Sequence, residues 1–363
     1  MNLDAMVNAF AYPEGAKTVT PFGNGHINDT FLVTAEGTED RYILQRINGY
    51  VFVKPAEVME NIRHVTDFLR RKITEEGGDP RRETMLLIPA RNGALFVTDE
   101  EGSVWRSFLF VPDTMSPDLP DSPEMLEECG RVFGLFSQRL LDYPADTLYE
   151  TIAGFHDTPH RMEQLEDAAR RNAAGKLDTV EEELRFARER GPETSALLDQ
   201  YRHGILPLRV THNDTKVNNI LIDRHTGKAV CVVDLDTVMP GLLAYDFGDA
   251  IRVGASTAAE DERDLSKVWL DLDKIQAFAR GYLRELGPVL EKPEILSLAK
   301  GAWMMTFENG IRFLADPLNG DVYFKIHRPD QNLDRARAQF ALALEMERNM
   351  ARMEQILLKL AGK

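Results

Sequence analysis

A polar loop enclosed by short apolar runs is the feature that most limits what this chain can fold into. The loop reads His212-Asn213-Asp214-Thr215-Lys216-Val217-Asn218-Asn219, in a part of the chain that is otherwise helical in pattern. Leu208 to Thr211 precedes it, Ile220 to Ile222 follows it, and the run Ala229 to Val233 leads into Asp234-Leu235-Asp236. Short apolar runs bounded by polar turns are typical of buried strands. The sequence therefore predicts a small β island that holds a polar loop within a helical region.

The elements predicted around this island indicate an α+β chain with two lobes. β-branched and aromatic runs separated by Gly, Asn and Asp predict strands at 18–22, 29–34, 41–47, 84–88, 94–97 and 104–111. An apolar stripe after Pro55 predicts one helix over 55–74, and the chain from 121 onward is mainly helical in pattern. The polar stretch 112–117, bounded by prolines, separates the two parts. We therefore expect a small β-rich N-lobe (1–112) and a larger, mainly helical C-lobe (113–363).

Composition excludes some classes of partner. The 363 residues carry a formal net charge of -16, with 43% hydrophobic and 28% charged residues, as in ordinary globular proteins. This charge repels nucleic acid and anionic membranes, so a small anion is bound only with the help of local cations or a metal. Cys129 and Cys231 are expected to be buried core thiols. The first residues lack the features of a signal peptide, and no apolar run approaches the about 20 residues that span a bilayer, which favours a cytoplasmic protein.

The polar loop has the spacing H-x-D-x-K-x-x-N of a phosphotransfer loop. Asp214 can accept the proton of a substrate hydroxyl, and Lys216, two residues later, can reach a γ-phosphate. Asn219 and Asp234 offer the hard oxygen ligands that Mg²⁺ prefers, and Asp236 can share the metal or bind substrate. This chemistry predicts a protein-kinase-like fold whose C-lobe carries the catalytic, metal and substrate groups.

Two further residues of this region are expected to have structural roles. His212 fixes the loop by hydrogen bonds. The triplet Asp246-Phe247-Gly248 spells the D-F-G of protein kinases, but it follows Pro240-Gly241 and opens a helix, with no apolar strand before it. We expect Asp246 to accept backbone N–H groups of the catalytic loop.

ATP is expected to bind the N-lobe without a P-loop, because no G-x-x-x-x-G-K-[ST] motif is present. The turn Gly23-Asn24-Gly25 offers backbone amides to the phosphates. Arg46 stands on the third strand, where kinases have a lysine, and its fork suits the α- and β-phosphates. Glu57 and Glu60 are alternative partners for Arg46. Phe110 and Val111 are expected to lie against the adenine.

These residues resemble the aminoglycoside phosphotransferase/choline kinase-like superfamily and, within it, the bacterial N-acetylhexosamine 1-kinases. The resemblance runs along nearly the whole chain and includes G-N-G-H-I-N-D-T-F (23–31), Y-I-L-Q-R-I-N (42–48), F-H-D-T-P-H-R (155–161), T-H-N-D-T-K-V-N-N (211–219), V-V-D-L-D-T-V-M-P-G (232–241) and E-N-G-I-R-F-L-A-D-P-L-N-G-D-V-Y-F (308–324). It implies ATP and Mg²⁺ as cofactors, and transfer of phosphate to the C1 hydroxyl of N-acetylglucosamine or N-acetylgalactosamine. It also implies sugar contacts at His26, Arg312 and Tyr323. Arg312 and Tyr323 fit this role because an arginine and an aromatic ring on a loop rich in Pro and Gly suit a sugar.

Other readings stay open at this point. The acceptor could instead be choline, homoserine or an aminoglycoside, or the chain could bind ATP without catalysis. The block around Arg312 favours a neutral polyol over a cationic substrate. We expect a monomer or a weak homodimer, and the preferred sugar epimer is undecided.

Overall fold

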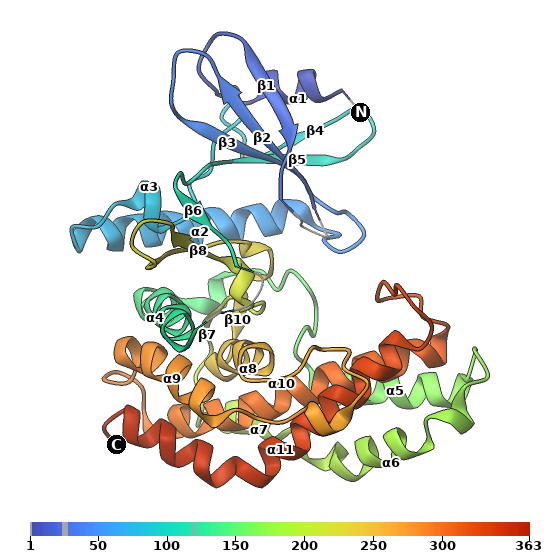
Figure 1. The fold of residues 1–363 in the computed structure, drawn as a ribbon. Coiled ribbons are helices and arrows are strands. Elements are labelled where there is room, and N and C mark those ends of the chain that lie inside the picture. Colours follow the sequence, from blue (N-terminus) through green and yellow to red (C-terminus); the bar gives the residue numbers. More distant parts are fainter. Residues whose placement is uncertain (1, 24–27, 118–119, 121) are drawn as a thin grey trace. The chain divides into compact units, whose positions relative to one another are not determined.

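The chain folds into two compact units, each assembled from segments that are far apart in the sequence. The structure, a computed structural model, describes residues 2–23, 28–117, 120 and 122–363 (Figure 1). The first unit comprises residues 1–117, 139–152 and 218–240, and the second comprises 118–138, 153–217 and 241–363. The polar loop is shared between them, because the division passes between Val217 and Asn218.

The first unit is built on an antiparallel sheet with strand order β1-β2-β3-β5-β4, and a smaller sheet has the order β6-β8-β9. The strands are β1 Lys17–Pro21, β2 Asp29–Ala35, β3 Arg41–Arg46, β4 Val97–Thr98, β5 Val104–Leu109, β6 Thr114–Met115, β8 Ile220–Asp223 and β9 Ala229–Val232. The helices are α1 Leu3–Ala9, α2 Pro55–Glu75 and α3 Pro80–Glu83, with 3-10 turns η1 Ala145–Thr147, η4 Val217–Asn219, which crosses the division, and η5 Leu235–Thr237. The β6–β8 pairing, with Thr114 opposite Asp223, ties the late segment to the early one.

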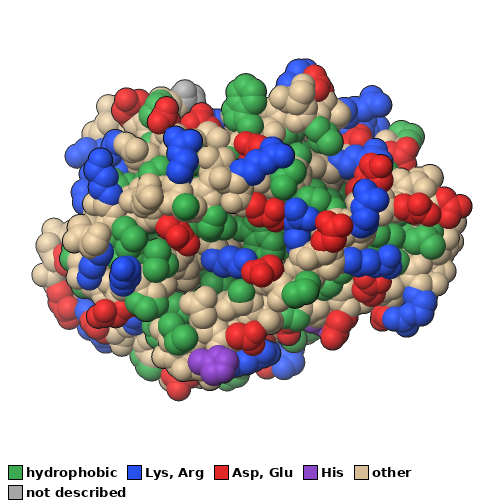
Figure 2. Space-filling view, turned by 90° about the horizontal axis from the view of Figure 1, so that it is seen from below, with side chains coloured by type: hydrophobic (Ala, Val, Ile, Leu, Met, Phe, Trp, Pro, Cys, Tyr) green, Lys and Arg blue, Asp and Glu red, His purple; other side chains and the backbone are tan. Residues whose placement is uncertain are grey.

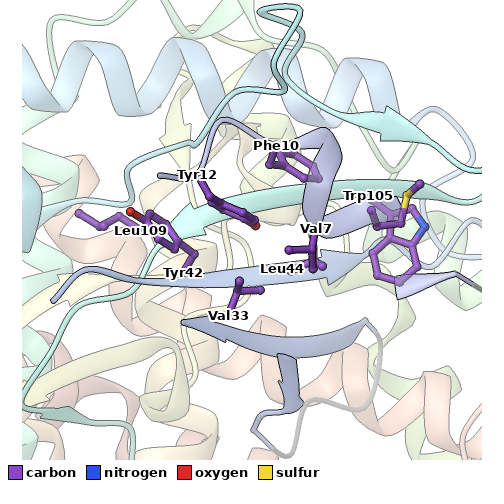
Figure 3. Close-up of a cluster of buried hydrophobic side chains, with 9 residues drawn as sticks. Val7, Phe10, Tyr12, Val33, Tyr42, Leu44, Trp105 and Leu109 are labelled. Carbon is purple, nitrogen blue, oxygen red and sulfur yellow. The ribbon is translucent and has the colours of Figure 1, made fainter. Parts of the chain in front are cut away.

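Alternation along β3 supplies the core of this unit. Tyr42 and Leu44 are buried on one face of the strand and join a cluster of apolar side chains, while Gln45 points to the other face. Figure 3 shows the cluster, in which the rings of Tyr12 and Tyr42 lie against each other with centroids 4.6 Å apart. Helix α1 contributes Met6 and Val7 to it. One face of β3 therefore packs in the apolar core, and the other face makes polar contacts.

The second unit is mainly helical and is organised around one long buried helix. Its helices are α4 Pro123–Arg139, α5 Thr158–Arg171, α6 Glu181–Arg190, α7 Ala196–Arg202, α8 Leu243–Gly254, α9 Leu272–Leu286, α10 Lys292–Asn319 and α11 Gln331–Leu360. Short elements are η2 Leu177–Thr179, η3 Gly191–Glu193, η6 Leu265–Lys267 and the strands β7 Arg209–Thr211 and β10 Met239–Gly241, the last of which crosses the division. Most residues of α10 are buried, because it packs against α5, α8 and α11 (Figure 1). This helix therefore fixes the positions of the others.

Two glycines allow α8 and α10 to approach closely. A Cβ atom on Gly301 would lie 2.0 Å from the carbonyl oxygen of Ala244, and one on Gly248 would lie 2.3 Å from the carbonyl oxygen of Gly301. Packing between α8 and α10 thus requires glycine at position 248, the last residue of the Asp246-Phe247-Gly248 triplet. Phe247 is fully buried beside Phe278, with ring centroids 5.6 Å apart.

The predicted α+β class is confirmed, and most predicted elements agree with the structure. The predicted strand at 84–88 is wrong, because Leu87 makes only an isolated bridge to Phe108. Of the predicted strand at 94–97 only Val97 is extended, in β4, and α1 was not predicted. Cys129 and Cys231 are both fully buried thiols, as expected, and burial raises the pKa of each to about 12.

The described helices carry no membrane-spanning segment, since none of them is both long and apolar enough to cross a bilayer. On the face drawn in Figure 2, Lys and Arg side chains are interspersed with Asp and Glu. Many of these charges form exposed pairs, such as Arg188 with Glu166, at 2.8 Å. Exposed pairs of this kind contribute about 0–1 kcal/mol each, so the fold depends on its buried contacts.

We expect Gly301→Ala to lower the free energy of unfolding by about 3 kcal/mol, because the new methyl group meets backbone that cannot move aside. Urea denaturation followed by circular dichroism measures the loss. Gly191→Ala is the matched control, since Gly191 has helical dihedral angles and open space around it. An alanine at 301 that stabilises the protein, as helix propensity alone predicts, would contradict this account of the α8–α10 contact.

Candidate active site

The catalytic loop of the second unit is held by one buried carboxylate. Asp246, in the first turn of α8, accepts hydrogen bonds from the backbone N–H of His212 at 2.8 Å and of Asn213 at 2.7 Å. The hydroxyl of Thr215 donates to the carbonyl oxygen of Asp246. Burial raises the pKa of Asp246, and His212 and the two backbone N–H groups offset only part of that effect. These contacts are the ones that the sequence assigned to Asp246, and they clamp the loop to α8.

His212 is a packed residue of the loop. Its side chain is fully buried, and its ring meets those of Phe133 and Phe136 edge-on, with centroids 5.9 and 6.0 Å apart. Its Nδ1 atom accepts a hydrogen bond from the backbone N–H of Asp214 at 3.3 Å. The ring therefore anchors the loop just before Asp214 and has no access to a ligand.

Asp214 and Lys216 lie together at the accessible end of the loop. Lys216 Nζ is 2.8 Å from Asp214 Oδ1, and the lysine side chain is 46% exposed. Desolvation favours the neutral amine, but the carboxylates of Asp214 and Asp249 outweigh it and raise the pKa of Lys216. Asp249 is itself buried and paired with Arg252 at 3.0 Å. A carboxylate next to a cation suits transfer of a phosphoryl group to a hydroxyl, since the carboxylate can take the proton and the cation offsets phosphate charge.

In the first unit, the two residues predicted to be metal ligands lie at the same end of the β8–β9 hairpin. Asn219 directly precedes β8 and Asp234 follows β9, and the backbone N–H of Val233 donates to the carbonyl oxygen of Asn219 at 2.9 Å. Asp234 has left-handed backbone dihedrals and is exposed, which turns the chain sharply after the strand. An amide oxygen and a carboxylate fit Mg²⁺, which takes one or two protein ligands and fills its octahedron with phosphate oxygens and water. The described residues contain no group of three or more His, Cys, Asp or Glu that would suit a metal on its own.

Asp236 differs from Asp234 in its surroundings and is not placed to bind a metal. It is 3% exposed, and both of its carboxylate oxygens are taken by the guanidinium of Arg106, with Nη2 at 2.9 Å from Oδ2. Asn28 Nδ2 also donates to Oδ2, at 2.8 Å. The prediction that Asp236 shares the metal is corrected accordingly, since a fully paired buried carboxylate has no free oxygen to offer.

Arg106 is the residue of this unit that sequence reasoning missed. It stands on β5 opposite Gln45 of β3, and its Nε donates to Gln45 Oε1 at 3.0 Å. Gln45 in turn donates to the hydroxyl of Thr30 at 3.1 Å. The signal was present in the sequence, because an arginine inside the apolar run Val104 to Val111 can be buried only with a partner. The network joins Asp236, just after β9, to the middle of the main sheet.

Arg46 lies on the third strand, β3, as predicted, but its ion-pair partner differs from the prediction. Its partner is neither Glu57 nor Glu60 but Asp29, with Nε at 2.8 Å from Oδ2, because the two residues stand directly opposite on β3 and β2. Glu57 pairs with Lys54 at 3.0 Å. Since side chains alternate along a strand, Arg46 shares the face of Tyr42 and Leu44, whereas Gln45 faces the Arg106–Asp236 pair. Arg46 is therefore on the wrong face of the sheet to act beside Asp236.

The remaining nucleotide residues are described in part. Gly23 is described, with φ of 75°, whereas Asn24, Gly25 and His26 lie outside the described residues. The ring of Phe110 meets that of Phe22 edge-on, with centroids 5.6 Å apart, and the Arg41 guanidinium lies 4.3 Å from its centroid. Val111 is buried. Phe22 and Phe110 thus form an aromatic surface next to the glycine turn.

Arg312 and Tyr323 line one cavity of about 280 Å³ at the C-terminal end of α10. Its other lining residues include Arg161 and Arg171 of α5 and Phe324. Contrary to the sequence prediction, Arg312 lies inside α10 and not on a loop; only Tyr323, which is 72% exposed, follows the helix. Gly310 looked like a loop signal, but it is a helical position where a Cβ atom would meet the Phe340 ring at 2.5 Å.

Asp316 shapes the loop that carries the aromatic rings of this cavity. Its carboxylate accepts the backbone N–H groups of Val322, Tyr323 and Phe324 at 2.8–3.1 Å. The guanidinium of Arg312 lies 5.6 Å from the Phe324 ring centroid. The cavity therefore combines arginine donors with aromatic faces, a pairing suited to a ligand rich in hydroxyl groups.

Comparisons with known proteins place the chain in a family of phosphotransferases and find the same fold over nearly its whole length. The family model described as "Phosphotransferase enzyme family" (APH) matches residues 18–286. A microcompartment-associated aminopropanol kinase is similar in structure, with TM-score 0.59 and 14% identity over 97% of this chain and 98% of that chain. An aminoglycoside phosphotransferase from Alicyclobacillus acidocaldarius has TM-score 0.60 and 14% identity over 98% and 96%. Spectinomycin phosphotransferase in complex with ADP and spectinomycin has TM-score 0.53 and 13% identity over 93% of both chains.

We expect Asp236→Ala to destabilise the protein by about 3–5 kcal/mol, because it leaves the buried Arg106 guanidinium without a partner. Asp29→Ala, which breaks the exposed pair with Arg46 on the same sheet, should cost less than about 1 kcal/mol. Urea unfolding of both variants gives the comparison. A stable Asp236→Ala protein whose only defect is a weakened requirement for Mg²⁺ would instead restore Asp236 as a metal ligand.

Proposed function

From the premise that this chain belongs to the APH phosphotransferase enzyme family, we propose that it is an ATP-dependent kinase for the C1 hydroxyl of N-acetylglucosamine or N-acetylgalactosamine. The observation that carries the proposal is the loop clamped by Asp246, which presents Asp214 and Lys216 as an adjacent carboxylate and cation. The product is the sugar 1-phosphate. The resemblance of the motifs to N-acetylhexosamine 1-kinases supports the sugar.

In the proposed reaction Asp214 orients the C1 hydroxyl for in-line attack on the γ-phosphorus and accepts its proton. An anomeric hydroxyl is more acidic than an ordinary alcohol, so a carboxylate suffices as the base. Lys216 offsets negative charge on the transferring group. Asn219 and Asp234 would hold Mg²⁺, which supplies further charge compensation at the phosphates when bound. Most of the rate enhancement then comes from positioning and electrostatics.

For the nucleotide, we propose that the backbone of the turn at Gly23 covers the phosphates and that the Phe22–Phe110 surface borders the adenine. The spectinomycin phosphotransferase complex, which holds ADP, supports a nucleotide cofactor. Arg106 is buried in its pair with Asp236 and holds the segment after β9, so it acts on the site through structure. Arg46 is left without a catalytic role in this proposal.

The charge of the acceptor cavity separates the sugar from its rivals. Arg161, Arg171 and Arg312 line the cavity, and of its two carboxylates Asp316 accepts backbone N–H groups and Asp167 is paired with Arg170. Choline and aminoglycosides are cations and would be repelled by three arginines. A neutral polyol accepts hydrogen bonds from arginine and stacks its apolar face on aromatic rings. These features favour the sugar over a cationic substrate.

The experiment that tests the proposal is ADP release from ATP and Mg²⁺ with a panel of acceptors, and phosphorus NMR of any product. The panel comprises N-acetylglucosamine, N-acetylgalactosamine, glucose, galactose, choline, homoserine and kanamycin. An anomeric phosphate on either N-acetylated sugar supports the proposal and shows the preferred epimer. Turnover of choline, homoserine or kanamycin alone would mean that the acceptor is that compound and not a sugar. Nucleotide binding with no turnover would point to a non-catalytic protein.

We expect Asp214→Asn to lower kcat by about 10²–10⁴-fold, the usual contribution of a general base, while the Kd for ATP stays within about two-fold. The asparagine keeps the shape of the side chain but cannot take the proton. Steady-state kinetics and calorimetry measure the two quantities. Asp178→Asn, an exposed position in η2, is the control and should change neither. If the variant at position 214 kept most of its kcat, Asp214 would not be the base.

A further inference from the structure

The segment Phe155 to Arg161 holds an unsatisfied polar atom next to the acceptor cavity. Among the described residues, His156 Nε2 is one of the few buried side-chain atoms with no hydrogen-bond partner, and Arg161 Nε is another. The His156 side chain is 9% exposed, and its ring lies between those of Phe155 and Tyr245, with centroids 4.5 and 5.0 Å away. A buried unpaired nitrogen costs about 1–3 kcal/mol, so this atom calls for a partner that the described side chains do not supply.

The other nitrogen of the same ring is firmly held. His156 Nδ1 lies 3.0 Å from Glu308 Oε1, and the Thr158 hydroxyl donates to Glu308 Oε2 at 2.7 Å. Glu308 is fully buried in α10. Burial opposes its ionisation, but His156, then Arg312 and Thr158, outweigh it and lower the pKa of Glu308. An ionised carboxylate only accepts hydrogen bonds, so Nδ1 carries the proton and the ring orientation is fixed.

The position of the ring links the catalytic loop to the acceptor cavity. On one side is Tyr245, the residue before Asp246, whose carboxylate holds the loop. On the other side Arg312 stands four positions after Glu308 on the same helix face, with its guanidinium 6.0 Å from the Phe155 ring centroid. Arg161, whose Nη2 donates to the Phe155 carbonyl oxygen at 3.1 Å, also lines the cavity. The ring therefore contacts Tyr245 and is held by α10, the helix that carries Arg312.

We propose that His156, positioned by Glu308, is a further acceptor-binding residue, whose Nε2 atom hydrogen-bonds a hydroxyl group of the substrate other than the one that is phosphorylated. This inference rests on the proposed kinase function. A hydroxyl is the matching partner because it can donate to a neutral imidazole nitrogen and accept from a protonated one. The proposal gives the segment F-H-D-T-P-H-R a role in recognition that its capping of α5 by Asp157 does not explain.

Two substitutions test the roles of the two ring nitrogens independently. The amide nitrogen of asparagine falls near the Nδ1 position, so His156→Asn keeps the bond to Glu308 and removes the Nε2 group. The amide nitrogen of glutamine falls near Nε2, so His156→Gln keeps the group offered to the substrate and loses the bond to Glu308. We expect His156→Asn to fold like wild type but to raise the Kd for the acceptor by about ten-fold or more. We expect His156→Gln to lower the Tm and to retain most of the acceptor affinity.

Calorimetric titration in the presence of Mg²⁺ and a non-hydrolysable ATP analogue measures the acceptor Kd without turnover. The Kd for the ATP analogue should stay within about two-fold in both variants, since His156 acts on the acceptor alone. N-acetylglucosamine analogues that each lack one hydroxyl then identify the contact. For one of them, the loss of affinity seen with wild-type protein should disappear in His156→Asn, as a double-mutant cycle requires for a direct contact.

The outcomes are distinct. A folded His156→Asn protein that binds the acceptor as tightly as wild type overturns the proposal and leaves Nε2 as a structural atom. Equal losses of affinity for the acceptor and for the ATP analogue overturn it too, because they signal general distortion. If wild-type protein binds a different panel compound and no sugar, the proposed function fails, and the same Kd comparison on that compound still decides the role of His156. A panel with no binder overturns both.

Discussion

The contact between the Asp246 carboxylate and the backbone of His212 and Asn213 is the one on which the catalytic unit depends. Asp246 sits in α8, and α8 is locked to α10 by the close approach at Gly248 and Gly301. The same α10 carries Glu308 and Arg312 on one face. The positions of the polar loop at 212–219 and of the cavity lined by Arg312 therefore both depend on a single helix pair. A small shift between α8 and α10 would move both at once, which explains why the pair is packed on glycine without room for adjustment.

In the first unit, the structure holds an acidic segment against a sheet. The turn after β9 carries Asp234 and Asp236, and two carboxylates so close in sequence repel each other unless one is neutralised. Arg106 pairs with Asp236 in a buried, bidentate arrangement, and Gln45 and Asn28 satisfy the remaining donors and acceptors. Asp236 is thereby neutralised, whereas Asp234 is exposed at the end of the hairpin. A buried pair of this kind adds little net stability, but it fixes geometry because breaking it is costly.

The sequence predicted those features that depend on residues close together in the chain. The spacing from His212 to Asn219, the alternation of Tyr42, Leu44 and Arg46, and the helix after Pro55 are all local patterns, and the structure contains the corresponding elements. The failures share a cause. The partner of Arg106 is 130 residues away, so its role could not be read from spacing. The Pro and Gly residues of the block 308–324 predicted a loop, yet Gly310 and Pro317 lie within α10, where a Cβ atom at 310 would meet the Phe340 ring of α11. Tertiary contact overrode local propensity in each case.

The contrast between net and local charge bears on what the acceptor site can bind. A chain with a formal charge of -16 attracts cations at long range, and on that ground alone an aminoglycoside or choline would be a reasonable substrate. At contact distance the balance differs, because the cavity is lined by three arginines, Arg161, Arg171 and Arg312, against two carboxylates, Asp167 and Asp316. Burial, and next the charge of Arg312, lower the pKa of Arg161. Close-range interactions outweigh screened long-range ones at a binding site. The sugar that we propose as acceptor fits this lining, because it offers many oxygen atoms to the arginines and carries no positive charge.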